Sequence, residues 1–411
     1  MSIEVRNIRD DELTAFIDTL TTGFLERPGD VAKIADEVRP FWDLTRAWAA
    51  FDGDRPCSTY RSWATELTVP GGARLPAAAV AAVSVLPTHR RRGILRAMTA
   101  AEHRAIRDRG EVFGLLHAAE WPIYGRFGYG PATQEATWTL DARSATFLGE
   151  TTGRMEIVAP STASRDRAKA VFETWRRREP ASLRRRDVSW DYDLGLIHSA
   201  WGDDWKGFLA IHEDASGSAD GFIRYTRTED RWEHRQPQNV LRVDELLALT
   251  EPAYADLWRF AAEMDWVATV RAERRQPAER LPWILANARA ARVSDVGDDL
   301  WVRIFDVPRA LEARTYEREG SVVIEVIDAE ASGGRMRVLL DVGPDGAACR
   351  ATDRSPDVTV DVSALGSAYL GGTRLRDAVR SLGADEHRAG ALLQADRLFR
   401  TLDEPWCTTF F

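Results

Sequence analysis

The amino-acid sequence predicts a mixed α/β fold, α+β in its last part, that is divided into three domains. The 411 residues exceed what one hydrophobic core usually organises, so two or three domains are expected. Residues 1–150 and 151–295 each alternate strands with helices, whereas residues 296–411 are first rich in strands and then helical. These patterns predict domain boundaries near residues 150 and 295.

The composition is that of a globular chain without a membrane segment. Hydrophobic residues make up 44% and charged residues 29%, and no apolar run is long enough to span a bilayer. The N-terminus lacks the layout of a signal peptide. The widely separated Cys57, Cys349 and Cys407 show no metal-ligand spacing, so we expect a cytoplasmic protein without a metal site. The net charge of −9 argues against nucleic acid as a partner and mildly favours cationic substrates.

The first domain is expected to begin with a short strand and a capped helix. Apolar residues recur at helical spacing from Leu13 to Leu20, and Asp10 or Asp11 precedes them as the expected N-cap. The expected strands are residues 4–8, 47–51, 61–69, 77–86, 112–118 and 135–140, the last of which closes the domain.

The later domains follow from the same kind of pattern. In the second, strand 240–246, helix 252–264 and strand 267–270 repeat the order of the first domain, but no Arg-x-x-Gly turn joins its strand to its helix. In the third, we expect strands at 300–304, 322–327, 335–340 and 358–362 and helices at 307–313, 363–370, 374–379 and 389–402.

The most informative segment runs from Val83 to Met98, where a strand enters a Pro-Thr-His-Arg-Arg-Arg-Gly turn and then a helix. Such a turn presents free backbone N–H groups and the positive end of the helix dipole to an anion. Arg90, Arg91 and Arg92 add guanidinium groups that pair with phosphate oxygens, and Gly93 permits close backbone approach. A basic run alone is at least as often a solvated surface, so the flanking strand and the helix, which ends at Gly110, carry the prediction of a polyphosphate site.

A second motif, Ile-Tyr-Gly-Arg-Phe-Gly-Tyr-Gly at residues 123–130, follows the strand at 112–118. The helix between two parallel strands makes a βαβ unit, so both motifs are expected near the same end of one sheet.

The turn resembles the pyrophosphate loop of the GNAT acyl-CoA-dependent N-acetyltransferases, Arg/Gln-x-x-Gly-x-Gly/Ala, except that Leu95 replaces the last small residue. Together with residues 123–130, the chain length and the aromatic C-terminus, it resembles the enhanced intracellular survival (Eis) branch of that family. The resemblance implies tandem GNAT-like domains, the second without a phosphate loop, and a sterol-carrier-protein-like domain. It also implies a homo-hexamer built as a trimer of dimers.

The resemblance further implies acetyl-CoA as co-substrate and no metal. The amide of Ala82 would lie at the oxyanion, where a backbone donor is worth roughly 3–4 kcal/mol. The residues that the resemblance implies in cofactor binding are Ala82, Val83, Val85, Arg90, Arg91, Gly93 and Ile94.

Tyr124 and Phe411 are the catalytic residues that the resemblance implies. A phenol with a pKa of about 10 stays protonated at neutral pH and can donate to a departing thiolate of pKa about 8.5, although Tyr124 could also be a packing residue. The sequence ends in Phe410 and Phe411, which predicts a tail packed inward. The resemblance makes the α-carboxylate of Phe411 the general base, whereas the alternative is ordinary docking of an apolar tail.

Several other residues compete for roles near the site. His117 could relay the proton but is more simply a satisfied core histidine, and His89 is expected beside phosphate or in solvent. Tyr129 is expected to be structural, and Ala119 stands where several family members have a serine. Residues whose role in amine binding is open are Trp42, Trp48, Glu26 and Asp30.

The leading functional hypothesis is acetyl transfer from acetyl-CoA to an amine of a polycationic small molecule such as an aminoglycoside. A protein or peptide lysine N-acetyltransferase is the alternative within the enzyme class. A lipid-binding or acyl-CoA-binding protein without catalysis is the alternative from another class. Neither nucleic acid nor a membrane is expected as a partner.

Overall fold

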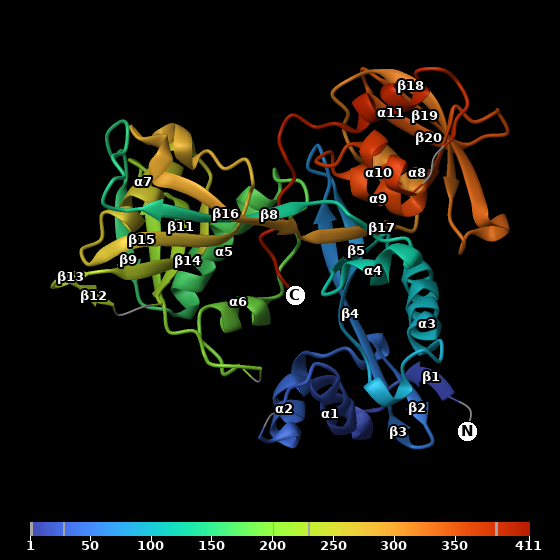
Figure 1. Ribbon diagram of the computed structural model, residues 1–411, viewed down its shortest axis with the longest axis horizontal. Coiled ribbons are helices and arrows are strands. Elements are labelled where there is room, and N and C mark those ends of the chain that lie inside the picture. Colours follow the sequence, from blue (N-terminus) through green and yellow to red (C-terminus); the bar gives the residue numbers. More distant parts are fainter. Residues whose placement is uncertain (1–2, 28, 200, 229–230, 383–384) are drawn as a thin grey trace.

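The structure, a computed structural model, describes residues 3–27, 29–199, 201–228, 231–382 and 385–411. These residues form three large mixed β-sheets with helices against them, arranged as three units, and one two-stranded antiparallel sheet (Figure 1). The chain belongs to the fold class that the sequence predicts.

The first sheet carries the strand–turn–helix motif. Its strands, in spatial order, are β1 (Ile3–Asn7), β2 (Ala47–Asp52), β4 (Ser58–Thr68), β5 (Arg74–Val85), β6 (Phe113–His117), β17 (Leu300–Ile304) and β7 (Gly130–Pro131), with β3 (Arg55–Pro56) paired to β2. Its helices are α1 (Leu13–Gly23), α2 (Val31–Val38), α3 (Ile94–Asp108) and α4 (Trp121–Tyr124).

The start of α1 differs from the prediction. Asp10 and Asp11 lie inside a short 3₁₀ turn, and α1 begins only at Leu13. Instead of an aspartate cap, the carboxylate of Glu12 accepts a hydrogen bond from the backbone N–H of Arg9, which satisfies a donor at the start of the turn. The Gly110 stop is confirmed, because α3 ends at Asp108 and Gly110 has a φ of +70°.

The second sheet is built mainly from the middle of the chain. Its strands, in spatial order, are β16 (Ala291–Asp298), β8 (Gln134–Asp141), β15 (Val267–Arg275), β14 (Asn239–Ala248), β11 (Ala219–Arg227), β10 (Phe208–Glu213) and β9 (Arg154–Val158). Its helices are α5 (Thr162–Arg176), α6 (Asp187–Asp193) and α7 (Glu251–Ala262), and β12 (Trp232–Glu233) pairs with β13 (Gln236–Pro237) beside it.

The third unit has its own sheet and a helical layer. The strand order is β20 (Gly346–Ala351), β19 (Arg335–Gly343), β18 (Gly320–Ile327), β21 (Val358–Asp361) and β22 (Asp385–Glu386). The helices are α8 (Val307–Ala313), α9 (Val362–Tyr369), α10 (Leu375–Leu382) and α11 (Ala391–Phe399).

Two strands belong to sheets other than those expected. The strand predicted at 135–140 was expected to close the first domain, but β8 lies in the second sheet between β15 and β16. The strand at 300–304 was expected in the third domain, but β17 pairs with β6 and β7 of the first sheet. Strand pairing thus crosses the predicted boundaries near residues 150 and 295. The boundaries themselves stay predictions.

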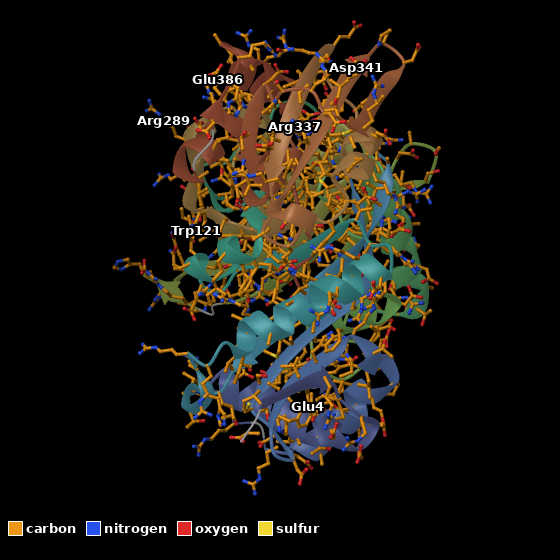
Figure 2. The ribbon with its side chains drawn as sticks, turned by 90° about the vertical axis from the view of Figure 1, so that its right-hand side faces the viewer. Glu4, Trp121, Arg289, Arg337, Asp341 and Glu386 are labelled. Atoms are coloured by element: carbon orange, nitrogen blue, oxygen red, sulfur yellow. The ribbon has the colours of Figure 1, made fainter. Side chains whose placement is uncertain are left out.

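The first sheet and the third unit share one apolar core. Buried residues of β5, β6 and β17 pack in the same cluster as those of β18, β21 and α9. Figure 2 shows α3 crossing the molecule between the N-terminal part and the third unit, with the exposed Trp121 at the rim. After α11 the chain leaves the third unit, passes the second and ends between the first and second (Figure 1).

Gly130 allows the third unit to approach the first sheet closely. A Cβ on Gly130 would lie 2.0 Å from the carbonyl oxygen of Ser363 in α9. The substitution Gly130→Ala is therefore expected to lower the free energy of unfolding by about 1–3 kcal/mol, the usual effect of overpacking. Thermal melting checks this, with Gly297→Ala as control, because a Cβ there has no neighbour within 4 Å. Equal melting temperatures for the two variants would contradict the close approach.

Candidate active site

The site begins where the pairing between β5 and β6 stops. These parallel strands pair only over Ala77–Ala79, although β5 continues to Val85. On the other side of β5, the register against β4 shifts, so that Ala82 and Val83 together oppose Tyr60. This is a β-bulge, which interrupts the ladder and redirects backbone groups.

Ala82 marks the centre of the bulge. Its φ is +54°, a left-handed conformation that is costly for a residue with a Cβ, and its carbonyl oxygen accepts a 2.8 Å hydrogen bond from the hydroxyl of Thr59. Backbone strain of this kind persists where surrounding structure enforces it, and it often accompanies function.

The turn after β5 leads directly into the N-terminus of α3. Gly93 has a φ of +76° and Arg91 a φ of +65°, and the first turn of α3 has no side-chain cap. Arg90, Arg91 and Arg92 are exposed, and none forms an ion pair within the described part of the chain. Uncapped amides and free guanidinium groups are the requirements of a phosphate site.

A cavity of about 1090 Å³ opens at this turn. Of the seven residues predicted to bind the cofactor, all except Ala82 line it, and so does Tyr124. The predicted residues on its wall are Val83, Val85, Arg90, Arg91, Gly93, Ile94, Ala119 and Tyr124. Neither Ala82 nor Phe411 lines this cavity.

Tyr124 is the last residue of α4, and its side chain lines this cavity. Burial, and secondarily the charge of Glu120, raises the pKa of the phenol to about 12. Among the described residues, no group forms a hydrogen bond with this hydroxyl, so it is available to a ligand in the cavity. Tyr129 is fully buried and its hydroxyl lies 3.2 Å from Nε2 of His103, which fits the structural role expected for it.

The C-terminal tail packs against the opposite side of the first sheet. The ring of Phe411 lies edge-on to Trp63 of β4 at 5.1 Å and to His117 of β6 at 4.6 Å. Arg185 donates to the hydroxyl of Thr409 at 3.0 Å and to the carbonyl oxygen of Thr408 at 3.1 Å. The tail packs on the protein as expected, although Phe410 itself is 58% exposed, with its ring centroid 4.8 Å from that of His117.

His117 contacts both this tail and the body of the protein. Its Nδ1 lies 3.0 Å from a carboxylate oxygen of Asp299, and its Nε2 lies 3.2 Å from the carbonyl oxygen of Thr409. Both ring nitrogens therefore face protein oxygens. This geometry favours a positioning role for the histidine, and a proton relay through it stays a hypothesis.

The remaining candidates have local explanations. The carboxylate of Asp30 accepts from the backbone of Lys33 and caps α2, and Glu26 is exposed. The indole of Trp48 donates to buried Glu102 at 2.7 Å. His89 lies on the cavity wall, with its Nε2 3.2 Å from Asp52.

Trp42 remains a candidate for a role in amine binding. The guanidinium of Arg61 stacks 4.0 Å from its ring centroid. Sequence reasoning missed Arg61, Trp63, Arg185 and Asp299, since only folding brings them to the tail; the Arg-Arg-Arg run at 184–186 was the one available signal.

The second unit repeats the architecture without the phosphate site. The helix α7 connects the parallel strands β14 and β15, as α3 connects β5 and β6. The hydroxyl of Thr250 accepts from the backbone of Ala253 and caps α7, and Glu251 adds a negative charge to its first turn. The positions that an anion would occupy are thus filled by the chain itself.

Comparison with known proteins agrees with this arrangement. Residues 4–132 and 181–304 each match a family described as acetyltransferase (GNAT) domain, and residues 307–408 match the sterol carrier protein domain. The fold and the site define a GNAT N-acetyltransferase, which is an acyltransferase enzyme.

The relatives specify the branch. An uncharacterized N-acetyltransferase of Streptomyces griseus is 39% identical over the full length of both chains. N-acetyltransferase Eis of Mycobacterium tuberculosis is 39% identical over 346 residues, which cover 82% of this chain and 77% of the relative. The crystal structure of Eis1 from Mycobacterium abscessus superposes with a TM-score of 0.86 at 33% identity, covering 99% of this chain and all of that one.

The chain therefore belongs to the Eis family of N-acetyltransferases. Enzymes of the GNAT class transfer acetyl groups from acetyl-CoA to an amine. Across the described residues, no helix combines the length and apolarity needed to cross a membrane.

Arg91 provides a test of the phosphate site. Because a charge-assisted hydrogen bond contributes roughly 1.5–3 kcal/mol, Arg91→Gln is expected to weaken CoA binding at least tenfold. Titration calorimetry measures the affinity. Arg104→Gln is the control, since Arg104 is an exposed arginine of α3, the helix that follows the turn, and lies outside the cavity. If both variants bind CoA like the wild type, Arg91 does not hold the diphosphate.

Proposed function

We propose that this protein transfers the acetyl group of acetyl-CoA directly to an amine, with Tyr124 as general acid and the α-carboxylate of Phe411 as general base. The observation that carries the proposal is the convergence of Tyr124 and the Arg90–Gly93 turn on one cavity at the end of β5. The acceptor amine attacks the thioester carbonyl, a C–N bond forms, and the C–S bond of CoA breaks.

The cavity residues supply binding and orientation. The guanidinium groups of Arg90 and Arg91, with the α3 amides beyond Gly93, pair with the diphosphate of acetyl-CoA. Val83 and Val85 hold the pantetheine arm along β5, and Ile94 packs beside it. The bulge at Ala82 supports a role for its amide as donor to the tetrahedral oxyanion, because a bulge turns backbone groups away from the ladder.

Tyr124 handles the leaving group. A phenol with a pKa of about 12 is protonated throughout the neutral range, which is the state that a proton donor needs. It donates a hydrogen bond to the sulfur as negative charge develops there, and the proton moves to the thiolate when the C–S bond breaks.

The tail supplies the base. Arg185 and His117 hold Thr408 and Thr409, so that the terminal residue reaches β4 and β6 near the point where β5 and β6 separate. Among the described residues, no cationic side chain forms an ion pair with the terminal carboxylate within 4.0 Å. It accepts the proton from the attacking amine, directly or through water.

The acceptor is an amine, and a polycationic small molecule such as an aminoglycoside is the proposed class. The net charge of −9 supports attraction of a polycation at long range. A lysine side chain of a protein or peptide is the alternative acceptor. A CoA-release screen with kanamycin-type amines and lysine peptides separates the two, and release with neither class contradicts both. The hexamer and the cytoplasmic location stay predictions.

Replacing Tyr124 by phenylalanine tests the general acid. Tyr124→Phe removes the hydroxyl and little volume, so turnover is expected to fall by about 10²-fold while CoA affinity stays nearly constant. Because the pKa is raised, deprotonation of Tyr124 is also expected to cause no loss of kcat in the wild type below about pH 11. CoA-release kinetics measure turnover, and unchanged turnover in Tyr124→Phe would reject the acid role.

Moving the terminal carboxylate tests the general base. One extra alanine at the C-terminus displaces the carboxylate by one residue, and kcat is expected to fall at least tenfold without a lower melting temperature. The same addition at the N-terminus is the control. Full activity of the extended chain would dismiss the Phe411 carboxylate as the base.

A further inference from the structure

Arg61 is a buried cation with unusual surroundings. It lies in β4 and is only 6% exposed. Its guanidinium stacks on two indoles, 4.0 Å from the ring centroid of Trp42 and 5.1 Å from that of Trp63. The two rings hold a flat cation between them, which is the geometry in which aromatic faces stabilise a guanidinium.

The hydrogen-bonding capacity of this guanidinium is unused. Its Nε and one terminal nitrogen are buried and have no hydrogen-bond partner among the described residues. Burial, together with the charge of Arg186, lowers the pKa of Arg61 to about 9, while Asp43 raises it. The Asp43 carboxylate is engaged elsewhere, 3.0 Å from the N–H of Thr45.

A second arginine, Arg186, lies beside the same indole ring as Arg61. The guanidinium of Arg186 lies 5.0 Å from the ring centroid of Trp63, and its Nε is also buried and unpartnered. Two like charges without a carboxylate between them repel each other, so this pair lowers stability unless an anion joins it.

The location of Arg61 relates the pair to the reaction. Arg61 is paired with Ala81, the residue that precedes the bulge at Ala82. The neighbouring Tyr60 packs on the α3 face of the sheet with Ile94, so Arg61 lies on the opposite face. Since the cofactor cavity lies on the α3 side, an acceptor approaches from the face that Arg61 occupies.

The tail belongs to the same face. The ring of Trp63 lies beside the guanidinium groups of Arg61 and Arg186 and beside the ring of Phe411. It is the ring of Phe411 that packs there, and the terminal carboxylate forms no ion pair with either arginine in the described structure. The tail carboxylate is therefore not the anion that these arginines hold.

We propose that Arg61 and Arg186 bind an anionic group of the acceptor, so that the preferred acceptor is an amine that also carries a carboxylate or a phosphate. The inference rests on the proposed acetyl transfer. It names an acceptor class that differs from the polycation considered above, for which the net charge is the support, and the comparison of matched amines below decides between the two. The cations also help the chemistry, because a nearby positive charge lowers the pKa of a bound ammonium group and favours the neutral, nucleophilic amine. A polycation without an anionic group would be repelled at this position.

The test uses matched acceptors that differ only in the anion. Each of a series of linear ω-amino carboxylates is compared with the alkylamine of the same chain length, and aminoalkyl phosphates form a third arm. For the wild type, kcat/KM is expected to be at least tenfold higher for one of the anionic amines than for its alkylamine, which is the effect of one charge-assisted hydrogen bond. Whether the carboxylate or the phosphate series shows the higher ratio identifies the anion, and either result supports the proposal.

Variants assign the effect to the arginines. In Arg61→Met this ratio is expected to fall close to one, and Arg61→Lys is expected to keep part of it. Arg186→Met, at a less buried position, is expected to lower the ratio as well. Arg271→Gln, an exposed arginine of β15 paired with Glu273, is the control for loss of one positive charge and should keep the wild-type ratio.

Melting temperature separates binding from packing. Because an unpartnered buried charge is removed, Arg61→Met is expected to melt at the wild-type temperature or above. A lower melting temperature with equal loss of activity on both members of a pair would assign Arg61 to packing and overturn the proposal. Equal kcat/KM for both members in the wild type, or a preference for polycations without an anion, would also overturn it and leave acetyl transfer standing. Absence of CoA release with every amine would instead reject the proposed function.

Discussion

The interruption of hydrogen bonding at the end of β5 is the constraint on which the site depends. A regular parallel pair would keep β5 and β6 together to Val85 and would leave no room for a ligand between them. Pairing instead ends at Ala79, and two residues of β5 face one residue of β4 at the bulge. The left-handed backbone conformation of Ala82 costs conformational free energy, and the surrounding sheet enforces it. The cavity, the turn and the approach of the tail all follow from this separation.

The site is an assembly of all three units. The first contributes the cavity, the second contributes Arg185, and the third sends its last residues past the second to reach the first. A buried, bidentate ion pair between Arg185 and Glu245 fixes the arginine that holds the tail. Docking of the terminus is therefore coupled to the folding of a unit that has no phosphate site of its own.

Sequence alone predicted the features that local pattern encodes. The turn at 90–93, the helix that follows and the position of Tyr124 depend on contiguous residues, and the structure places them on one cavity. The sheet membership of β8 and β17 could not be read in this way, because it depends on pairing with strands that are far away in the sequence. Arg61, Trp63 and Asp299 carry no motif, and only tertiary packing brings them beside the tail.

The late position of β17 has a consequence for biosynthesis. One edge of β6 is paired by β5, but the other is covered only by residues 300–304. A ribosome has therefore made about three quarters of the polypeptide before this edge is closed, and until then its backbone groups are open to nascent neighbours. The sheet of the N-terminal unit therefore cannot be completed as that unit emerges, but only after residues 300–304 have been synthesised.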